Sequence, residues 1–172
     1  LGARYYQNNV ESDALTILKN NGANYVRLKL WVDPYDENGN PYGGGNNDYA
    51  TTLALARRAK NLGMGVLIDF HLSDFWTDPA NQIKPKAWKD LSYSELKTTL
   101  YNYMKDTLNN FAAAGIVPEM VQVGNEISAG ILHDDGKVGN GNEDFSNLAG
   151  LLESAIAGVR ASSASNLSLI HI

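Results

Sequence analysis

Asparagine and glutamate stand together at positions 125 and 126, directly after the short apolar segment that begins at Val121. A buried strand that delivers a carboxylate at its C-terminal end is how a parallel β/α barrel presents a catalytic acid. The amide of Asn125 is suited to hydrogen-bond a sugar hydroxyl next to the reacting carbon. Because an unpaired buried carboxylate is costly, Glu126 must be either paired or functional. The pair therefore predicts acid–base chemistry.

Two earlier apolar segments also end in polar and aromatic side chains. The side chains concerned are Arg27 and Trp31 in the first, and Asp69, His71, Asp74 and Trp76 in the second. The apolar face of a pyranose stacks on tryptophan, whereas arginine, histidine and asparagine hydrogen-bond its hydroxyl groups. We therefore predict that these side chains, together with Asn125, bind a sugar.

Most of these side chains also have a structural interpretation. Trp31 is alternatively a core aromatic, and His71 a buried histidine with satisfied hydrogen bonds. Asp69 is expected in the middle of a strand, where it is alternatively a buried partner of Arg27. For Trp88 we favour anchoring of its loop over contact with a ligand.

The sequence lacks signatures of a metal centre or of an activated serine. Its three histidines, His71, His133 and His171, have no metal-ligand spacing, and no nucleophile elbow occurs. Segment 133–144 is acidic, but it does not match the spacing of a helix-loop-helix calcium site, so we interpret it as a solvated loop. We expect no metal and no cofactor.

Helical and strand patterns alternate along the chain. Apolar periodicity, capping residues and glycine stops predict helices over 11–21, 48–63, 92–114 and 146–161, and strands over 24–32, 65–70, 120–126 and 167–172. This alternation predicts an α/β fold with a parallel sheet, either doubly wound or closed into a barrel.

Loop lengths favour the barrel. The loops after the strands are long (32–47, 71–91 and 127–145), whereas the loops after the helices are short (22–23, 63–64 and 115–119). A barrel with its site at the C-terminal ends of the strands has this asymmetry. No glycine-rich phosphate fingerprint follows any strand, which argues against a nucleotide-binding domain.

Bulk properties exclude several classes of protein. The chain has 172 residues, whereas a closed eight-stranded barrel typically needs ~250. Its net charge of -5 and the lack of a lysine or arginine cluster argue against a nucleic-acid partner. No segment is long and apolar enough to predict a membrane span. There is no cysteine, so no disulfide framework is expected.

Long blocks of the sequence together resemble one known family, glycoside hydrolase family 53. The blocks are Asp13-Ala-Leu-Thr-Ile-Leu-Lys, Tyr25-Val-Arg-Leu-Lys-Leu-Trp-Val-Asp-Pro, Leu67-Ile-Asp-Phe-His-Leu-Ser-Asp-Phe-Trp-Thr-Asp-Pro, Lys84-Pro-Lys-Ala-Trp and Met120-Val-Gln-Val-Gly-Asn-Glu-Ile. The family comprises endo-β-1,4-galactanases that cut type I arabinogalactan. The resemblance runs through nearly the whole chain.

The resemblance implies a secreted (β/α)8 TIM barrel with a retaining mechanism that is monomeric when complete and acts on β-1,4-galactan. By resemblance, Glu126 at the end of barrel strand 4 is the general acid/base. Arg27, His71 and Asn125 match positions around the attacked galactose, and Trp76 lies in a loop that lines the cleft.

The chain departs from the family pattern in two respects. It covers roughly strands 2 to 5 of the barrel, as a partial catalytic domain over 1–172, and the family's nucleophile is a second glutamate at the end of strand 7. Glu143 and Glu153 are the only glutamates after Glu126, and they fall in an expected loop and helix. His133-Asp134 stands where the family often has Trp-Pro, which removes one stacking contact.

The C-terminal segment 166–172 has two interpretations. Residues 167–172 read Leu-Ser-Leu-Ile-His-Ile, which equals the in-frame translation of a widely used transposase sequencing adaptor and is then a cloning artefact. Alternatively they are native, because strand 5 of the family tends to end in Ile-His. Resequencing of the source DNA beyond this point distinguishes the two.

Two other functions remain open. One is another retaining β-glycanase of the same clan, acting on mannan or glucan, because such enzymes share the Asn-Glu pair. The other is a carbohydrate-binding module that has kept the cleft without the chemistry. A small α/β nucleotide-binding domain is a distant third alternative.

Overall fold

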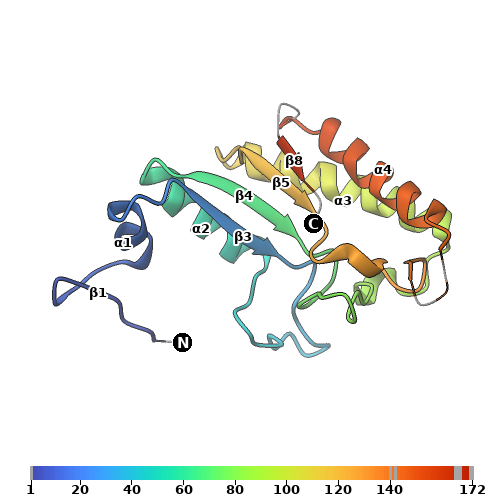
Figure 1. The fold of residues 1–172 in the computed structure, drawn as a ribbon, viewed down its shortest axis with the longest axis horizontal. Helices are drawn as coiled ribbons and strands as arrows, with labels where there is room; N and C mark the ends of the chain where they lie inside the picture. Colours follow the sequence, from blue (N-terminus) through green and yellow to red (C-terminus); the bar gives the residue numbers. More distant parts are fainter. Residues whose placement is uncertain (1, 140, 142, 165–167, 171–172) are drawn as a thin grey trace.

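The computed structural model describes residues 2–139, 141, 143–164 and 168–170. Its elements follow the alternating order expected from the sequence (Figure 1). They are β1 (Tyr6–Gln7), β2 (Val10–Glu11), α1 (Ala14–Asn20), β3 (Tyr25–Leu30), α2 (Tyr49–Asn61), β4 (Gly65–Phe70), η1 (Lys86–Trp88), α3 (Tyr93–Ala113), β5 (Met120–Val123), η2 (Ile127–Ala129), β6 (Gly130–Ile131), β7 (Gly136–Lys137), α4 (Ser146–Arg160) and β8 (Ser168–Ile170).

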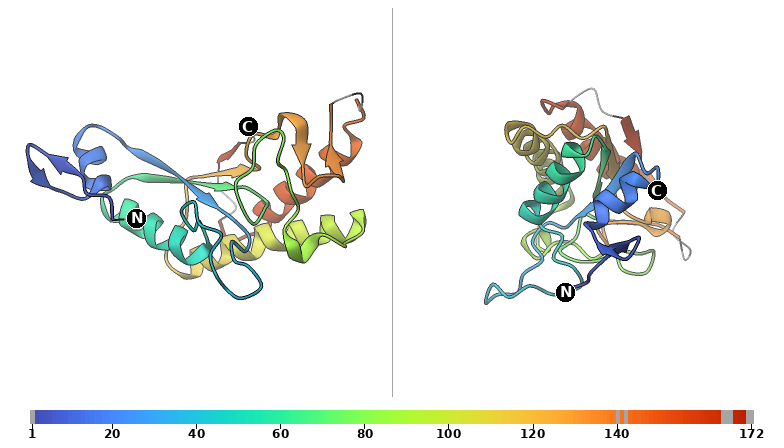
Figure 2. Two further views of the ribbon diagram at one scale, coloured as in Figure 1. Left: turned by 90° about the horizontal axis from the view of Figure 1, so that it is seen from below. Right: turned by 90° about the vertical axis from the view of Figure 1, so that its left-hand side faces the viewer.

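A four-stranded parallel sheet organises the chain. Its spatial order is β3-β4-β5-β8, the same as the order along the sequence. A doubly wound sheet reverses its strand order at a switch point, whereas a barrel does not. Accordingly, α2, α3 and α4 lie together on one side of the sheet (Figure 2). The arrangement is that of a segment of a β/α barrel.

The two faces of this sheet differ in chemistry. The face toward the helices is apolar and contributes to the core; it comprises Val26, Leu28, Leu30, Val66, Ile68, Phe70, Val121 and Val123. Side chains alternate between faces along a strand, so the intervening residues lie on the other face. Strand register places Lys29, Asp69 and Gln122 in one row there. Since parallel sheets are normally apolar on both faces, this polar row marks the face that carries function.

Capping residues define where the helices begin. Asp48 accepts a hydrogen bond from the backbone N–H of Thr51 and so caps α2. Ser92 and Glu95 form the predicted capping box of α3. The first helix begins at Ala14 rather than at residue 11, because Val10–Glu11 pairs with Tyr6–Gln7 as a short hairpin.

One predicted strand end and one predicted loop need correction, and the last predicted strand is confirmed where the structure describes it. The third strand ends at Val123, not at 126, because Gly124 and Glu126 adopt left-handed backbone conformations. The loop predicted over 128–144 contains the antiparallel pair β6–β7. Of the predicted strand 167–172, Ser168–Ile170 forms β8, while 167, 171 and 172, and with them His171, lie outside the described residues.

Close packing of α4 on α3 generates a prediction about Gly158. A Cβ at this position would lie 2.3 Å from the backbone oxygen of Tyr101 in α3, so the helices would have to separate. We expect Gly158→Ala to lower the free energy of unfolding by about 1–3 kcal/mol in urea denaturation.

Gly150→Ala is the matched control in the same helix. Its closest contact would be the hydroxyl end of the Tyr93 side chain rather than backbone, and that end can shift at the cost of its hydrogen bond to the backbone oxygen of Asn147. Because alanine favours a helix over glycine and so offsets the loss of that hydrogen bond, this change should alter stability by no more than about 1 kcal/mol. Equal destabilisation by both substitutions would contradict the packing account.

Candidate active site

The predicted site residues lie near the C-terminal ends of three adjacent strands. Arg27 comes from β3, Asp69 from β4 with His71 just after it, and Asn125 and Glu126 follow β5. Because the strands are parallel and in register, their ends meet at one edge of the sheet. The structure thus brings together residues that are up to 99 positions apart in the sequence.

Arg27 is the centre of a polar network on the face of the sheet that points away from the helices, called here the inner face. Its Nη2 lies 2.8 Å from Oδ2 of Asp69 and donates to Oδ1 of Asn125 at 2.7 Å. Its Nε donates to Oε1 of Gln122 at 2.9 Å. Asp69 is fully buried, whereas 43% of the Arg27 side chain is exposed. The structural pair of Arg27 and Asp69 is therefore confirmed, and the Arg27 side chain as a whole remains partly exposed.

His71 is buried, and its ring accepts a hydrogen bond at Nδ1 and faces a carboxylate at Nε2. The backbone N–H of Thr77 donates to Nδ1 at 3.2 Å, so Nδ1 is the acceptor and we assign the ring proton to Nε2. Nε2 lies 3.3 Å from Oδ2 of Asp69, which also contacts Arg27. One carboxylate oxygen therefore orients both His71 and Arg27.

Asn125 and Glu126 differ in how they are held. The side chain of Asn125 is buried; its Nδ2 donates to the backbone oxygen of Thr77 at 2.7 Å, and its Oδ1 accepts from Arg27. Glu126 is exposed and has a left-handed backbone with φ of 53°. Within the described residues its carboxylate makes no hydrogen bond, so it is free to meet a ligand.

The aromatic residues divide into a buried support and an exposed platform. Trp31 is fully buried, as the core interpretation predicted, and its ring packs against Trp76 and Phe75 at centroid distances of 5.5 and 5.0 Å. Trp76 remains 42% exposed. The ammonium group of Lys29 lies 4.0 Å from the centroid of the Trp76 ring, a cation–π contact on the inner face.

Asp74 joins two loops to one another, and Trp88 anchors its loop to a helix. Oδ1 of Asp74 accepts the backbone N–H of Asp33 at 3.0 Å, and its Oδ2 accepts that of Lys86 at 2.8 Å. Trp88 is buried and contacts Tyr103 of α3 edge-on at 5.3 Å, which confirms its anchoring role. Both side chains thus fix the walls of the site.

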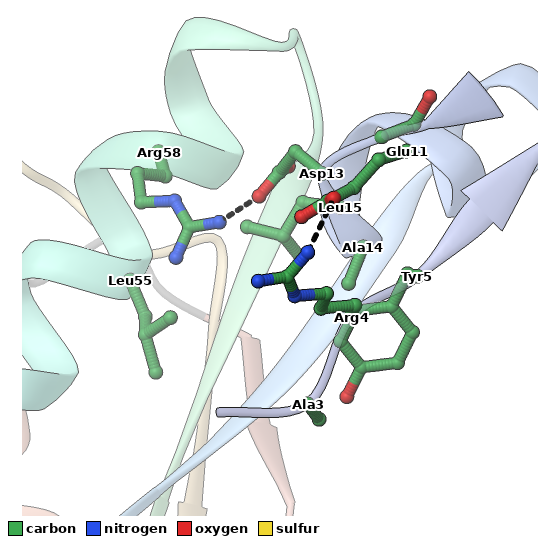
Figure 3. A pocket seen from close by; sticks show the side chains of 10 residues that line it. Ala3, Arg4, Tyr5, Glu11, Asp13, Ala14, Leu15, Leu55 and Arg58 are labelled. Atoms are coloured by element: carbon green, nitrogen blue, oxygen red, sulfur yellow. Dashed lines mark hydrogen bonds and ion pairs between the residues drawn. The ribbon is translucent and has the colours of Figure 1, made fainter. Parts of the chain in front are cut away.

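Two of the hollows on the surface of the described residues bear on where the site lies. One, of about 650 Å³, adjoins Trp76 between the loops that follow β3 and β4, and Tyr42, Phe75 and Ile83 also line it. The other, of about 770 Å³, lies near the N-terminus beside α1 and α2, where Arg58 pairs with Asp13 and Arg4 with Glu11 (Figure 3). No predicted site residue lines the second hollow, so the candidate site is at the strand ends.

Neither a metal site nor a membrane span is found in the described part of the chain. No cluster of three or more histidine, aspartate or glutamate side chains there could hold a metal ion. None of the helices in those same residues has the length and apolarity to cross a bilayer.

Sequence reasoning missed four side chains of this site. Lys29, Gln122, Thr77 and Gln82 have no motif of their own. For Lys29 and Gln122 the signal was their alternation with apolar residues inside predicted strands. For Thr77 and Gln82 no signal in the sequence marks them, because their partners lie 43 to 48 residues further along the chain.

Comparison with known proteins gives consistent matches over the whole chain. The family model described as glycosyl hydrolase family 53 matches residues 1–172. An endo-β-1,4-galactanase of Bacillus subtilis is 42% identical over 97% of this chain and 37% of its own length. An arabinogalactan endo-β-1,4-galactanase of Humicola insolens is 44% identical over 94% of this chain and 45% of its own length.

Solved structures agree with these matches. A family 53 catalytic domain from Ignisphaera aggregans aligns with a TM-score of 0.92 and 48% identity, covering 99% of this chain and 46% of that domain. A fungal β-1,4-galactanase aligns with a TM-score of 0.87 and 39% identity. The chain thus spans less than half the length of these relatives. The α/β barrel class predicted from the sequence is confirmed.

The shared carboxylate of Asp69 generates a stability prediction. In Asp69→Asn the neutral amide no longer balances the charge of Arg27 at 2.8 Å, although exposure of Arg27 to water limits the cost. We expect a loss of about 1–3 kcal/mol in the free energy of unfolding, measured by urea denaturation.

Asp106→Asn serves as the control for this change. Asp106 lies 3.6 Å from Lys105 with 62% of its side chain exposed, so its loss should alter stability by no more than about 0.5 kcal/mol. If both variants unfold at the same denaturant concentration as wild type, the Asp69 network does not stabilise the fold.

Proposed function

The chain belongs to glycosyl hydrolase family 53, and we propose that it is part of an endo-acting, retaining β-1,4-galactanase that hydrolyses type I arabinogalactan. The observation that carries this proposal is the exposed carboxylate of Glu126 beside Asn125 at the C-terminal edge of a parallel sheet. The matched relatives named as galactanases support the substrate class.

Glu126 acts as the general acid and base in this proposal. A retaining glycosidase uses two carboxyl groups about 5–5.5 Å apart. Protonated Glu126 gives its proton to the glycosidic oxygen while the second carboxylate attacks the anomeric carbon. The resulting carboxylate of Glu126 then deprotonates the water that hydrolyses the glycosyl-enzyme.

Neighbouring side chains bind the sugar that is attacked. Asn125 uses one amide hydrogen for Thr77, so its second amide hydrogen is available to a hydroxyl group next to the anomeric carbon. The exposed part of Arg27 donates to a further hydroxyl group. His71 completes this polar wall, and Trp76 offers its ring to the apolar face of a galactose unit. Trp31 and Asp74 support this surface through Trp76 and the adjacent loops.

The second carboxylate is proposed to come from the part of the barrel beyond this segment. Glu143 precedes α4 and Glu153 lies within it, so neither extends from a strand end of the sheet. Residues 1–172 alone are therefore expected not to hydrolyse galactan. We further propose that the complete enzyme is a monomer that acts outside the cell.

Glu126→Gln tests the proposed function in the complete barrel enzyme. The amide keeps the shape of the side chain but cannot exchange a proton, so kcat on β-1,4-galactan should fall by about 10²–10⁴-fold. Reducing-sugar release from galactan, mannan and β-glucan measures this. Glu153→Gln, an exposed change on α4, should leave the rate unchanged.

The substrate panel separates the alternative functions. Turnover of mannan or glucan instead of galactan would assign a different β-glycanase of the same clan. Binding of galactan that is unchanged in Glu126→Gln, with no turnover by wild type, would assign a non-catalytic carbohydrate-binding protein.

Trp76→Ala tests the proposed sugar platform. Loss of the exposed indole should weaken binding of galacto-oligosaccharides by about 1 kcal/mol, roughly fivefold. Isothermal titration of the complete enzyme measures the change. Tyr6→Ala, an exposed aromatic in the hairpin near the N-terminus, is the control and should bind as wild type does. Equal affinity of Trp76→Ala and wild type would remove Trp76 from the site.

A further inference from the structure

The backbone that carries Glu126 leaves the sheet before it reaches this residue. β5 ends at Val123, and Gly124 and Glu126 then adopt left-handed conformations with φ of 82° and 53°. A side chain at Gly124 would meet Cγ2 of Ile127 at 2.6 Å, so the turn requires glycine there. Left-handed conformations are unfavourable for residues with a Cβ and persist only where surrounding contacts impose them. The direction of the Glu126 side chain therefore depends on contacts from outside the strand.

Gln82 supplies such contacts from the loop after β4. Its side chain is buried, and Nε2 donates to the backbone oxygen of Asn125 at 2.8 Å. The same nitrogen lies 3.2 Å from the backbone oxygen of Glu126 and 3.1 Å from that of Asp78. Its two hydrogens are thus shared among three carbonyl groups, two of which, those of Asn125 and Glu126, flank the Cα of Glu126.

The loop that contains Gln82 is itself fixed at both of its ends. Thr77 hydrogen-bonds Nδ1 of His71 and accepts the amide of Asn125. The backbone oxygen of Gln82 accepts the N–H of His133 at 2.7 Å. Segment 77–82 is therefore tied to the histidine, to the Asn125–Glu126 turn and to the loop before β7.

We propose that Gln82 is a positioning residue for the acid/base: it holds the carbonyl groups of Asn125 and Glu126, and so the direction of the Glu126 carboxyl. This inference rests on the proposed function of Glu126. A residue of this kind changes the rate of the chemical step more than substrate binding, because it does not contact the sugar. A glutamine that merely fills space would affect stability alone.

Gln82→Glu is the sharpest variant in the complete barrel enzyme. It keeps the size of the side chain, removes both N–H donors and places a carboxylate oxygen beside three carbonyl oxygens. We expect kcat on β-1,4-galactan to fall by about 10- to 100-fold, with KM within about twofold of wild type. Gln82→Met, which removes the donors without adding charge, should also lower kcat.

Two controls separate positioning from loss of folding. Asn81→Ala removes a hydrogen bond to Asp78 within the same loop, at 2.8 Å, but no contact with residues 125–126. Val159→Ala makes a cavity under α4, in the core and away from the strand ends. Both should keep the kcat of wild type when assayed at a temperature where every variant is folded.

Hydrogen exchange gives a readout that does not need activity. In the same enzyme, Gln82→Glu should speed amide exchange of a peptide covering residues 124–128 by about 10-fold or more, whereas Val159→Ala should not do so selectively. Wild type without galactanase activity would overturn the proposed function, and exchange would then decide the role of Gln82. A kcat equal to wild type, or exchange at 124–128 that is unchanged in Gln82→Glu, would overturn the proposal for Gln82.

Discussion

Asp69 carries a carboxylate that is fully buried, on a strand that pairs with a neighbour on each side. A charge in such a place is tolerated only when it is paired, and here one oxygen lies 2.8 Å from Arg27 and 3.3 Å from His71. Arg27 extends the network to Gln122 and Asn125. Three strands must therefore align in one register for this charge to be satisfied, and that register also sets the ends of the strands side by side.

The two faces of the sheet differ in the side chains that they present. One face of the sheet packs apolar side chains against α2, α3 and α4, while the other presents the polar row that contains Lys29, Asp69 and Gln122. Loops after the strands then complete the site, with Trp31 and Asp74 fixing the surfaces around the exposed Trp76. The carboxyl group of Glu126, which we propose acts on the substrate, is exposed on a turn, and neighbouring loops contact that turn.

Local sequence patterns predicted most of the strands and helices and several of the site residues. The apolar run Gly65–Phe70 is a strand with the predicted bounds, and Ser92 with Glu95 caps α3 as expected. The pair of Arg27 and Asp69 was one of the two interpretations that the sequence left open for Asp69. The left-handed turn at Glu126 was not predicted, because its contacts come from residues distant in the sequence, such as Gln82, 44 residues earlier. Contacts of that kind are set by the tertiary fold and leave no periodic or capping signal.

Chemical rescue tests the central claim, that Glu126 is the acid/base of a retaining enzyme, most directly. In a complete barrel enzyme with Glu126→Ala, an aryl β-galactoside with a good leaving group needs no acid for the first step, but the glycosyl-enzyme then lacks a base. Azide, which needs no base, should raise the rate and give a product with a β-linked azide, seen by nuclear magnetic resonance. An α-linked azide would make Glu126 the nucleophile instead, and a rate that does not depend on azide would contradict its acid/base role.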